Sequence, residues 1–287
     1  MLEQPLFEPC CSPMPFAPGD RKPSVSCPHT PRQNYLLSVL PLPDYERLLP
    51  YLELVPLPLG STIHGACERE KHMYFPISGS VSRGCSTQNG GLLQCAVTGK
   101  EGAIGVSLFL GGESSTCAAV VASVGYAYRL RADLLKKEVE INGPLQHLLL
   151  RYTLILMEHA AQIATCTRYH SVEQQLCRVI LGCLDLSLSK ELTMTHEQIS
   201  NMLGVRREGV TEAAGRLQEA GLIHYSRGSI AVLDRSKLEA RACECYAVIK
   251  RGYVRFFQKF GDPESLQSER DNPIESFVAP GQEPLIC

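Results

Sequence analysis

Between Tyr35 and Leu130, hydrophobic residues come in short runs that glycines interrupt, among them HMYFPISGSVSRG, GLLQCAVTG and CAAVVASVGYAYRL. Short β-rich runs with turn residues at roughly regular spacing are typical of a small all-β barrel or roll. The segment NYLLSVLPLPDYERLLPYL, ahead of these runs, predicts one or two short helices. The pattern therefore predicts a jelly-roll-like β-roll within residues 32–130.

From Ala132 the hydrophobic period lengthens to that of a helix, with a break near Gly143-Pro144, where proline suits the first turn of a new helix. Apolar residues lie nearly all round this long helix, so it has to be covered on more than one side. We expect one side to pack on the β-roll and another on a second copy of the chain, since twofold dimers are the commonest oligomers. A core helix of a monomer is the alternative. The expected dimer interface is Leu145, Leu149, Tyr152, Leu156 and Ile163.

Residues 194–234 hold two short amphipathic runs separated by a single glycine. Thr195 and Gln198 have the spacing of a capping box, which predicts the start of a helix. Gly204 allows a tight turn that a Cβ would hinder, and a second helical period begins at about Arg206. Two short helices joined by such a turn form a helix-turn-helix unit. The run AGLIHYSRGSIAVLD that follows predicts a two-stranded wing around Arg227.

The polar side chains at the start of the second helix indicate what this unit binds. Arginine can pair with guanine O6 and N7, glutamate can accept from cytosine N4, and threonine can serve a phosphate or a base edge. The first turn of a recognition helix is where such side chains reach bases in the major groove. A merely solvated charged face is the alternative. The predicted contacts to double-stranded DNA are Thr195, His196, Arg206, Arg207, Glu208, Thr211, Glu212 and Arg227.

The charge distribution favours a phosphate-bearing partner for the same region. The whole chain has a formal net charge of −2, yet residues 190–260 carry 12 Lys and Arg against 8 Asp and Glu. The two ends differ from the rest, because residues 1–31 contain eight prolines and residues 261–287 carry six acidic residues against one basic residue. Neither end has a periodic apolar face, so we expect both to be disordered.

The chain contains 13 cysteines, whose spacings fit no zinc motif. Cys243 and Cys245 are two residues apart in an expected helix, so their side chains should point to different sides. We expect a cytoplasmic protein, because the sequence shows no secretory signal and charges interrupt its most apolar segment. Most cysteines are then expected to be small buried residues with reduced thiols.

The succession of a β-roll, a long helix and a winged helix-turn-helix resembles the Crp/Fnr family of bacterial transcription regulators over roughly residues 34–250. THEQISNMLGVRREGVTEAAGRLQEAGLI is similar to the family's helix-turn-helix, and YFPISGSVS and GAIGVSLFLGG are similar to strands and turns of its cyclic-nucleotide-binding-type domain. The resemblance implies an α+β fold and base reading by Arg207 and Glu208. Glu212 stands where some members carry a further base-reading arginine, so we expect a different target sequence.

The resemblance is weaker at the family's nucleotide site. Members that bind a cyclic nucleotide use a Gly-Glu pair and a later Arg-Ser or Arg-Thr, whereas this chain has Gly105-Val106 and no arginine in ESSTCAA. A buried phosphate would lack its charged partner, so we do not expect cyclic AMP to bind. Iron-sulfur members carry an N-terminal cysteine cluster, but Cys10, Cys11 and Cys27 lack the spacing of four-thiolate ligation. We expect neither cofactor and assign no effector.

These features predict a homodimeric regulator of an inverted-repeat DNA site, with RNA polymerase among its expected partners. The expected parts are a sensor at residues 32–130, a dimerisation helix at 131–168 and a DNA-binding domain at 169–260. The alternative is a cytosolic ligand- or redox-responsive protein whose winged helix contacts a protein. An enzyme is not expected, because GLLQCAVTGKEG departs from the phosphate-loop motif at Gln94 and Glu101, and no metal-ligand or nucleophile-base spacing is evident.

Overall fold

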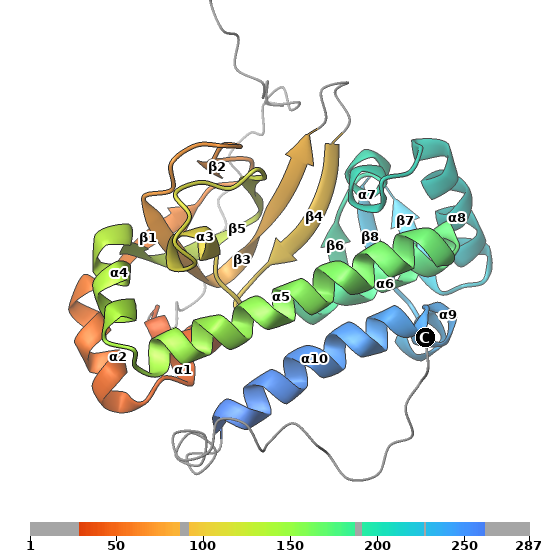
Figure 1. The fold of residues 1–287 in the computed structure, drawn as a ribbon. Helices are drawn as coiled ribbons and strands as arrows, with labels where there is room; N and C mark the ends of the chain where they lie inside the picture. The colour runs from red at the N-terminus through yellow and green to blue at the C-terminus, as the bar shows by residue number, and fades with distance from the viewer. Residues whose placement is uncertain (1–28, 87–91, 187–190, 227, 262–287) are drawn as a thin grey trace, which may run out of the picture.

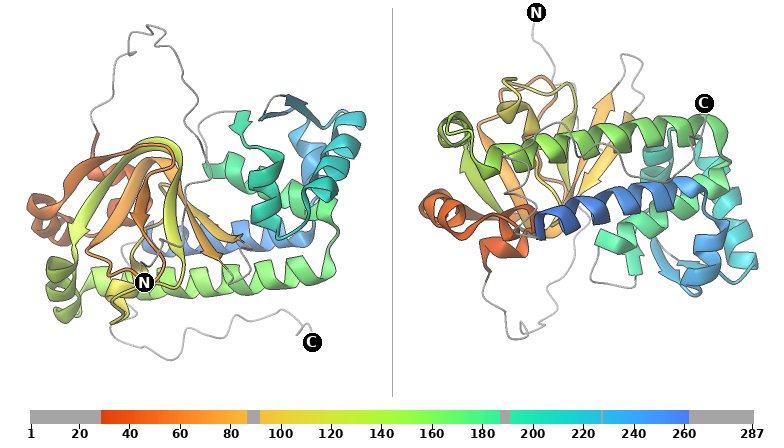
Figure 2. Two further views of the ribbon diagram at one scale, coloured as in Figure 1. Left: turned by 90° about the horizontal axis from the view of Figure 1, so that it is seen from above. Right: turned by 60° about the horizontal axis from the view of Figure 1, so that its bottom comes forward.

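The structure, a computed structural model, describes residues 29–86, 92–186, 191–226 and 228–261. A β-roll lies at one end of the molecule and a winged helix at the other, and two long helices run alongside both parts (Figures 1 and 2). The predicted disordered tails, residues 1–31 and 261–287, lie almost entirely outside the described residues. Within the described ranges, no helix is long and apolar enough to cross a membrane.

Antiparallel strands form the sheet of the roll, in the order β1-β5-β3-β4, with β2 also paired to β5. Their bounds are β1 Glu53–Leu57, β2 Thr62–His64, β3 His72–Ser86, β4 Leu92–Thr98 and β5 Ala118–Arg131. The long strands β3 and β5 shift register at three places along their pairing. Such irregularities increase the local twist and bend a strand, as the closure of a roll requires.

Short helices pack around the roll, and Asn34 fixes the start of α1 to it. The Asn34 side-chain oxygen accepts hydrogen bonds from the N–H groups of Leu36 and Leu37, and its amide donates to the carbonyls of Pro76 and Gly102, both at 2.9 Å. The predicted helical segment before the strands is confirmed. The helices are η1 Pro31–Gln33, α1 Tyr35–Ser38, α2 Leu42–Leu48, η2 Leu49–Tyr51, α3 Val106–Phe109 and α4 Ala132–Glu140.

The long helix α5, Pro144–Tyr169, follows α4 and begins at the predicted proline. Leu145, Leu149 and Tyr152 are only 2%, 0% and 1% exposed, because they belong to the core that α5 shares with Phe75 and other residues of the roll. The prediction that these three residues form a dimer interface is therefore wrong, since the chain itself covers them. The other two predicted interface residues, Leu156 and Ile163, are half-buried.

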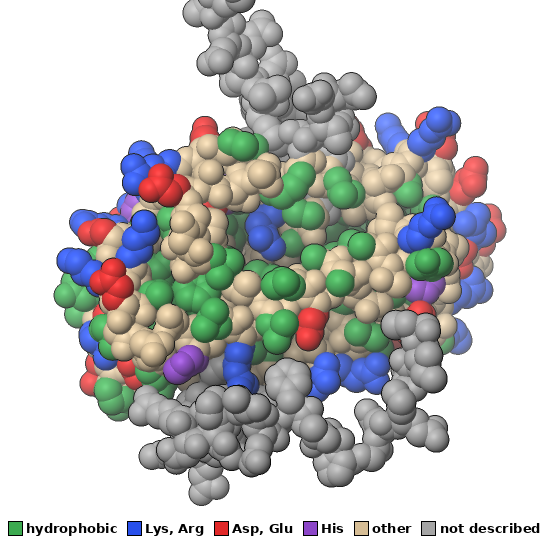
Figure 3. Space-filling model, viewed as in Figure 1, with side chains coloured by type: hydrophobic (Ala, Val, Ile, Leu, Met, Phe, Trp, Pro, Cys, Tyr) green, Lys and Arg blue, Asp and Glu red, His purple; other side chains and the backbone are tan. Residues whose placement is uncertain are grey.

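A different stripe of α5 is uncovered. Leu150, Leu154 and Met157 are 48%, 49% and 64% exposed, and Ala161 and Ala164 continue the line as exposed residues. In the view of Figure 3, hydrophobic side chains run across the middle of the molecule, where Figure 1 shows α5, with few charged side chains among them. The helix thus has one buried side and one apolar side that the described part of the chain leaves open.

The last helix, α10 Glu244–Gly261, returns antiparallel to α5 (Figure 2). Its ring contacts fix this direction, because Tyr253 lies edge-on to His159 with centroids 6.0 Å apart, and Phe256 lies 6.4 Å from the ring of Tyr152. Helix α6, Val172–Leu186, starts a few residues after α5 ends and joins α5 to the winged helix. Helix α10 therefore supplies a second cover for α5, in addition to the roll.

The winged helix has a core of its own. Its small sheet has the order β6-β8-β7, and its helices bury one face each against α6 and this sheet. The predicted pair of helices and the wing are present. The elements are β6 Glu191–Thr193, α7 His196–Leu203, α8 Arg207–Glu219, β7 Ile223–Ser226, β8 Ser229–Val232 and α9 Arg235–Arg241.

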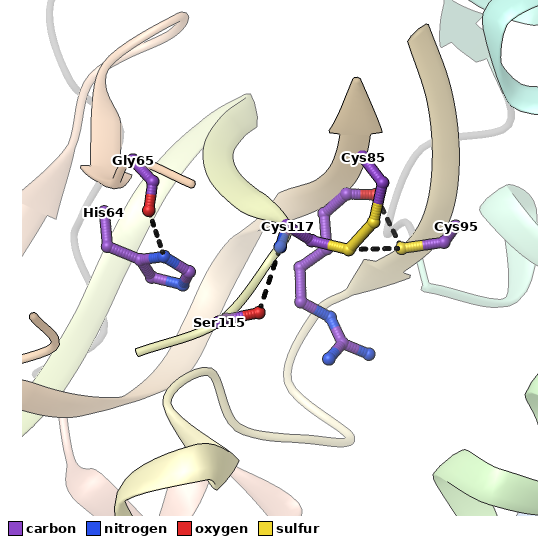
Figure 4. Close-up of a disulfide and its surroundings, with 7 residues drawn as sticks. His64, Gly65, Cys85, Cys95, Ser115 and Cys117 are labelled. Atoms are coloured by element: carbon purple, nitrogen blue, oxygen red, sulfur yellow. Dashed lines mark hydrogen bonds between the residues drawn. A yellow bond between two sulfur atoms is a disulfide. The ribbon is translucent and has the colours of Figure 1, made fainter. Parts of the chain in front are cut away.

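Cys85, at the end of β3, forms a disulfide with Cys117, which precedes β5 (Figure 4). The Cys95 sulfur on β4 lies 3.8 Å from the Cys117 sulfur. The expectation that the thiols are reduced is wrong at this pair. The antiparallel register that pairs Gly84 with Ala118 places the two cysteines opposite one another, and a sequence separation of 32 residues does not reveal this register.

Candidate nucleic-acid interface

The first helix of the predicted helix-turn-helix begins at a capping box. The Thr195 hydroxyl accepts a hydrogen bond from the Gln198 N–H at 3.2 Å, and the Gln198 side-chain oxygen accepts one from the Thr195 N–H at 2.8 Å. The helix ends at Gly204, whose φ of 65° is a left-handed conformation that suits glycine. The spacing of these residues therefore fixes α7 as predicted. The Thr195 side chain is occupied by this cap.

Helix α8 presents its first turns to solvent. Arg206 is its N-cap residue, and the side chains of Arg207, Glu208 and Glu212 are exposed. Among the described residues, Arg206 and Arg207 form no ion pair. The opposite face of α8 is buried and holds the helix against α6 and the wing. That face consists of Val210, Ala213, Ala214 and Leu217.

His196 and Thr211 connect the two helices with the wing. Thr211 Oγ1 lies 2.9 Å from His196 Nδ1 and 3.1 Å from the Arg207 carbonyl oxygen. The His196 ring also stacks on Tyr225 of β7, with centroids 4.2 Å apart. Burial and the nearby Arg207 charge lower the pKa of His196, which favours the neutral ring. The geometry thus gives His196 a positioning contact within the domain.

An ion-pair network that the sequence did not indicate fixes α8 from the other end. Glu173 of α6 accepts from Arg216 of α8 at 2.7 Å and from Arg241 of α9 at 2.8 Å. Hydrogen bonds from both guanidinium groups lower the pKa of Glu173. These two arginines therefore have a partner inside the domain, in contrast to the arginines at the start of α8. The network could be found only once the fold placed α6 beside α8.

The wing is a tight hairpin in which β7 and β8 pair from Ile223↔Val232 to Ser226↔Ser229. Gly228 in its turn has a φ of 79°, which glycine adopts without strain. Arg227, the predicted phosphate contact, lies outside the described residues. Its contact with DNA stays a prediction, as do those of the other predicted interface residues.

In the roll, Gly105 and Val106 stand where the resemblance implies a Gly-Glu pair in members that bind a cyclic nucleotide. Gly105 has a φ of 96° and starts α3, and Val106 is buried. The buried carboxylate of Glu70 accepts a hydrogen bond from the Ser107 hydroxyl and lies 3.6 Å from His64 Nε2. The Glu70 carboxylate lies beside Gly105 and would repel an anion placed there. The N-terminal cysteines Cys10, Cys11 and Cys27 lie outside the described residues.

A cavity of about 750 Å³ lies between β4, α6 and α10. Most of its lining is apolar, but Glu101, His159 and Arg178 also border it. Burial raises the pKa of Glu101 to about 7 and, together with the charge of Arg178, lowers the pKa of His159 to about 4. The sequence could not predict this cavity, because the elements that enclose it are distant along the chain.

The fold and this interface define a protein with a β-roll, a long connecting helix and a winged helix-turn-helix. Residues 174–241 match the model of the Crp-like helix-turn-helix domain. The chain therefore carries a Crp-like helix-turn-helix domain and shares the fold of Crp/Fnr-family transcription regulators, which confirms the predicted fold class and the predicted resemblance.

Solved structures share this fold at low sequence identity. FixK2 from Bradyrhizobium japonicum is 18% identical, with 67% of this chain and 98% of that chain covered and a TM-score of 0.58. TTHB099, a CRP-family regulator from Thermus thermophilus, is 19% identical over 66% and 96%, with a TM-score of 0.56. TTHA1359, a CRP/FNR-family regulator from the same organism, is 21% identical over 66% and 98%, with a TM-score of 0.51. No curated protein matches the chain.

Proposed function

We propose that this protein is a sequence-specific transcription regulator that binds double-stranded DNA as a homodimer. The observation that carries the proposal is the exposed set of Arg206, Arg207 and Glu208 at the start of α8 in a Crp-like domain. Glu173 pairs with Arg216 at the far end of the same helix. Within the described part of the chain, Arg206 and Arg207 form no ion pair, and they stand at the end of α8 that a recognition helix would insert into the major groove.

The predicted DNA contacts of α8 and the wing have different proposed roles. Arg207 can donate two hydrogen bonds to a guanine, and Glu208 can accept one from a cytosine N4 group. Arg206 and, in the wing, Arg227 contribute positive charge toward the phosphates. Because His196 supports the helices from within, we assign it to positioning instead of base reading.

We infer that the dimer forms along the uncovered stripe of α5. Leu150, Leu154, Met157, Ala161 and Ala164 are spaced alternately by four and three residues, which is the spacing of a coiled-coil seam. Leu145, Leu149 and Tyr152, on the buried side of α5, pack the helix against the roll. A twofold dimer along this seam would present two recognition helices, for half-sites about one helical turn, roughly 34 Å, apart.

The β-roll, within residues 32–130, is proposed to sense an effector and to transmit its state through the helix region 131–168 to the DNA-binding region 169–260. Such transmission is a shift between two dimer geometries that the effector binds unequally. The Glu70 carboxylate beside Gly105 and the buried Val106 support an effector other than cyclic AMP. RNA polymerase is the further partner that a DNA-bound regulator would contact.

The proposal is tested by selecting bound fragments from random-sequence DNA with the purified full-length protein, at about 50 mM and about 200 mM salt. We expect an enriched inverted repeat and binding that weakens steeply with salt, because phosphate contacts release counterions. Salt-dependent binding without enrichment would remove sequence specificity from the proposal. Absence of DNA binding at both concentrations would favour the alternative in which the winged helix contacts a protein.

A further inference from the structure

Four potential metal ligands meet where the two long helices α5 and α10 approach each other. Cys166 and His170 are four residues apart at the end of α5, and Cys243 and Cys245 flank the first residue of α10. One ligand atom from each residue lies within 4.8 Å of all the others. Cys166 Sγ is 3.5 Å from Cys243 Sγ, and Cys245 Sγ is 3.4 Å from His170 Nδ1.

These distances are close to those of a tetrahedral zinc site. With metal–sulfur bonds of about 2.3 Å and metal–nitrogen bonds of about 2.0 to 2.1 Å, neighbouring ligand atoms stand roughly 3.5 to 3.8 Å apart. Three thiolates and one imidazole are also an ordinary donor set of structural zinc. Cys166, Cys243 and Cys245 are 0%, 4% and 0% exposed, so the ligand atoms are withdrawn from solvent, as in a closed structural site.

The groups around the cluster fit the same chemistry. Nε2 of His170 lies 3.1 Å from Glu244 Oε1, so that its other nitrogen, Nδ1, faces the sulfur atoms. A metal-bound histidine nearly always donates its second ring N–H to such an acceptor, which fixes the tautomer and the ring orientation. Gln162 donates a hydrogen bond to Cys245 Sγ at 3.0 Å, a contact that a thiolate accepts well.

We propose that Cys166, His170, Cys243 and Cys245 bind one zinc ion in tetrahedral coordination. The ion would join the end of α5 to the start of α10, directly after the winged helix, and so hold the DNA-binding domain against the helix that carries the proposed dimer seam. A disulfide between Cys166 and Cys243 is a weaker interpretation, because it would use two of the four groups and leave Cys245 and His170 unexplained.

The expectation that Cys243 and Cys245 point to different sides is wrong, because it requires both residues to be helical and α10 begins only at Glu244. Helix α9 ends at Arg241, Ala242 is extended with ψ 155°, and Cys243 precedes α10. The side chains of a residue just before a helix and of one in its first turn can converge. The i,i+4 pair of Cys166 and His170 comes from a distant part of the chain, so the linear spacing of the four residues follows no known pattern.

The test is metal analysis of the full-length protein purified under reducing conditions without added metal. We expect about one zinc per chain. The Cys166→Ser and Cys243→Ser variants should lose the metal, whereas Cys67→Ser, at an exposed cysteine, should keep it. Glu244→Gln, a change at a positioning residue, should weaken zinc affinity roughly 10- to 100-fold. Retention of zinc by the Cys166→Ser/Cys243→Ser double variant would overturn the assignment.

A second measurement on the unaltered protein avoids any folding defect of the variants. After chelation and addition of Co²⁺, we expect the visible bands of tetrahedral cobalt with sulfur-to-cobalt charge transfer in the near ultraviolet. Folded protein that contains no zinc and gives no such spectrum would overturn the proposal, as would a Cys166–Cys243 disulfide found by mass spectrometry in the reduced preparation. None of these readouts involves DNA, so the metal site and the proposed function can fail separately.

Discussion

The imidazole of His196 lies nearly flat on the ring of Tyr225, with centroids 4.2 Å apart and an interplanar angle of 21°. His196 starts α7 and Tyr225 lies in the wing, so the stack joins the first helix of the helix-turn-helix to the hairpin. Through Thr211, 2.9 Å from His196 Nδ1, the same residue also contacts the recognition helix. His196 therefore adds polar and ring contacts between α7, α8 and the wing to the hydrophobic core that these elements share.

His196→Ala should therefore destabilise the winged helix by about 1 kcal/mol, since it removes an aromatic contact and a hydrogen bond. DNA affinity should fall while base preference stays the same, because His196 is proposed to position the helices and not to contact a base. Urea unfolding and binding to a selected site measure the two effects. His224→Ala, at an exposed residue of the same wing strand, is the control. Altered base preference in His196→Ala would show that His196 contacts bases directly.

Glu101 should make stability depend on pH. Burial raises its folded-state pKa to about 7, above the usual 4.5, so the unfolded chain holds fewer protons on this group between these values. Protonation of Glu101 therefore favours the folded state, and this contribution to stability is lost as pH rises from about 4.5 through 7. In Glu101→Gln this loss disappears, because the amide does not ionise.

The comparison to make is the free energy of unfolding of Glu101→Gln relative to the unaltered protein at pH 5 and pH 8. The difference should shift in favour of the variant by about 2 to 3 kcal/mol toward pH 8, since a pKa unit corresponds to about 1.4 kcal/mol. The Gly99 N–H donates a hydrogen bond to the Glu101 carboxylate at 2.8 Å, and the amide oxygen of the variant can still accept this bond. A difference that is constant with pH would contradict the burial argument.

Leu154→Glu should convert the proposed dimer into a monomer. The Leu154 side chain is 49% exposed, so the substitution leaves the core of one chain intact, whereas two glutamates would face each other across a twofold seam. Sedimentation velocity should show the monomer and reduced affinity for a full inverted repeat. Leu110→Glu, at a residue of the roll that is 56% exposed, should remain dimeric. An unchanged dimer in Leu154→Glu would place the interface elsewhere.

The winged helix could be predicted from the sequence because its signals are local. The capping box of Thr195 and Gln198 and the glycine at 204 each act within a few residues, and the structure confirms the helices that they predict. The charged start of α8 follows from the same spacing. The contacts of Glu173 with Arg216 and Arg241 needed the fold, because they join helices that are about 40 to 70 residues apart.

The faces of α5 could not be assigned from its periodicity. A helix that is apolar nearly all round has several apolar stripes that the sequence pattern does not distinguish. Only the packing of the roll and of α10 shows that Leu149 is buried and Leu154 is exposed. The return of α10 along α5 also brings Cys166 to Cys243, a pairing without any local signal. The proposed dimer seam and the proposed zinc site thus both depend on tertiary contacts.

DNA reading by α8 is tested most directly by the affinity of Arg207→Ala for the inverted repeat recovered by selection. If Arg207 reads a base, the variant should lose about 1 to 3 kcal/mol of binding free energy and accept other bases at one symmetric position of each half-site. Arg251→Ala, which removes the same charge from the exposed surface of α10, should bind as the unaltered protein does. Equal affinity and base preference for Arg207→Ala and the unaltered protein would contradict DNA reading by α8.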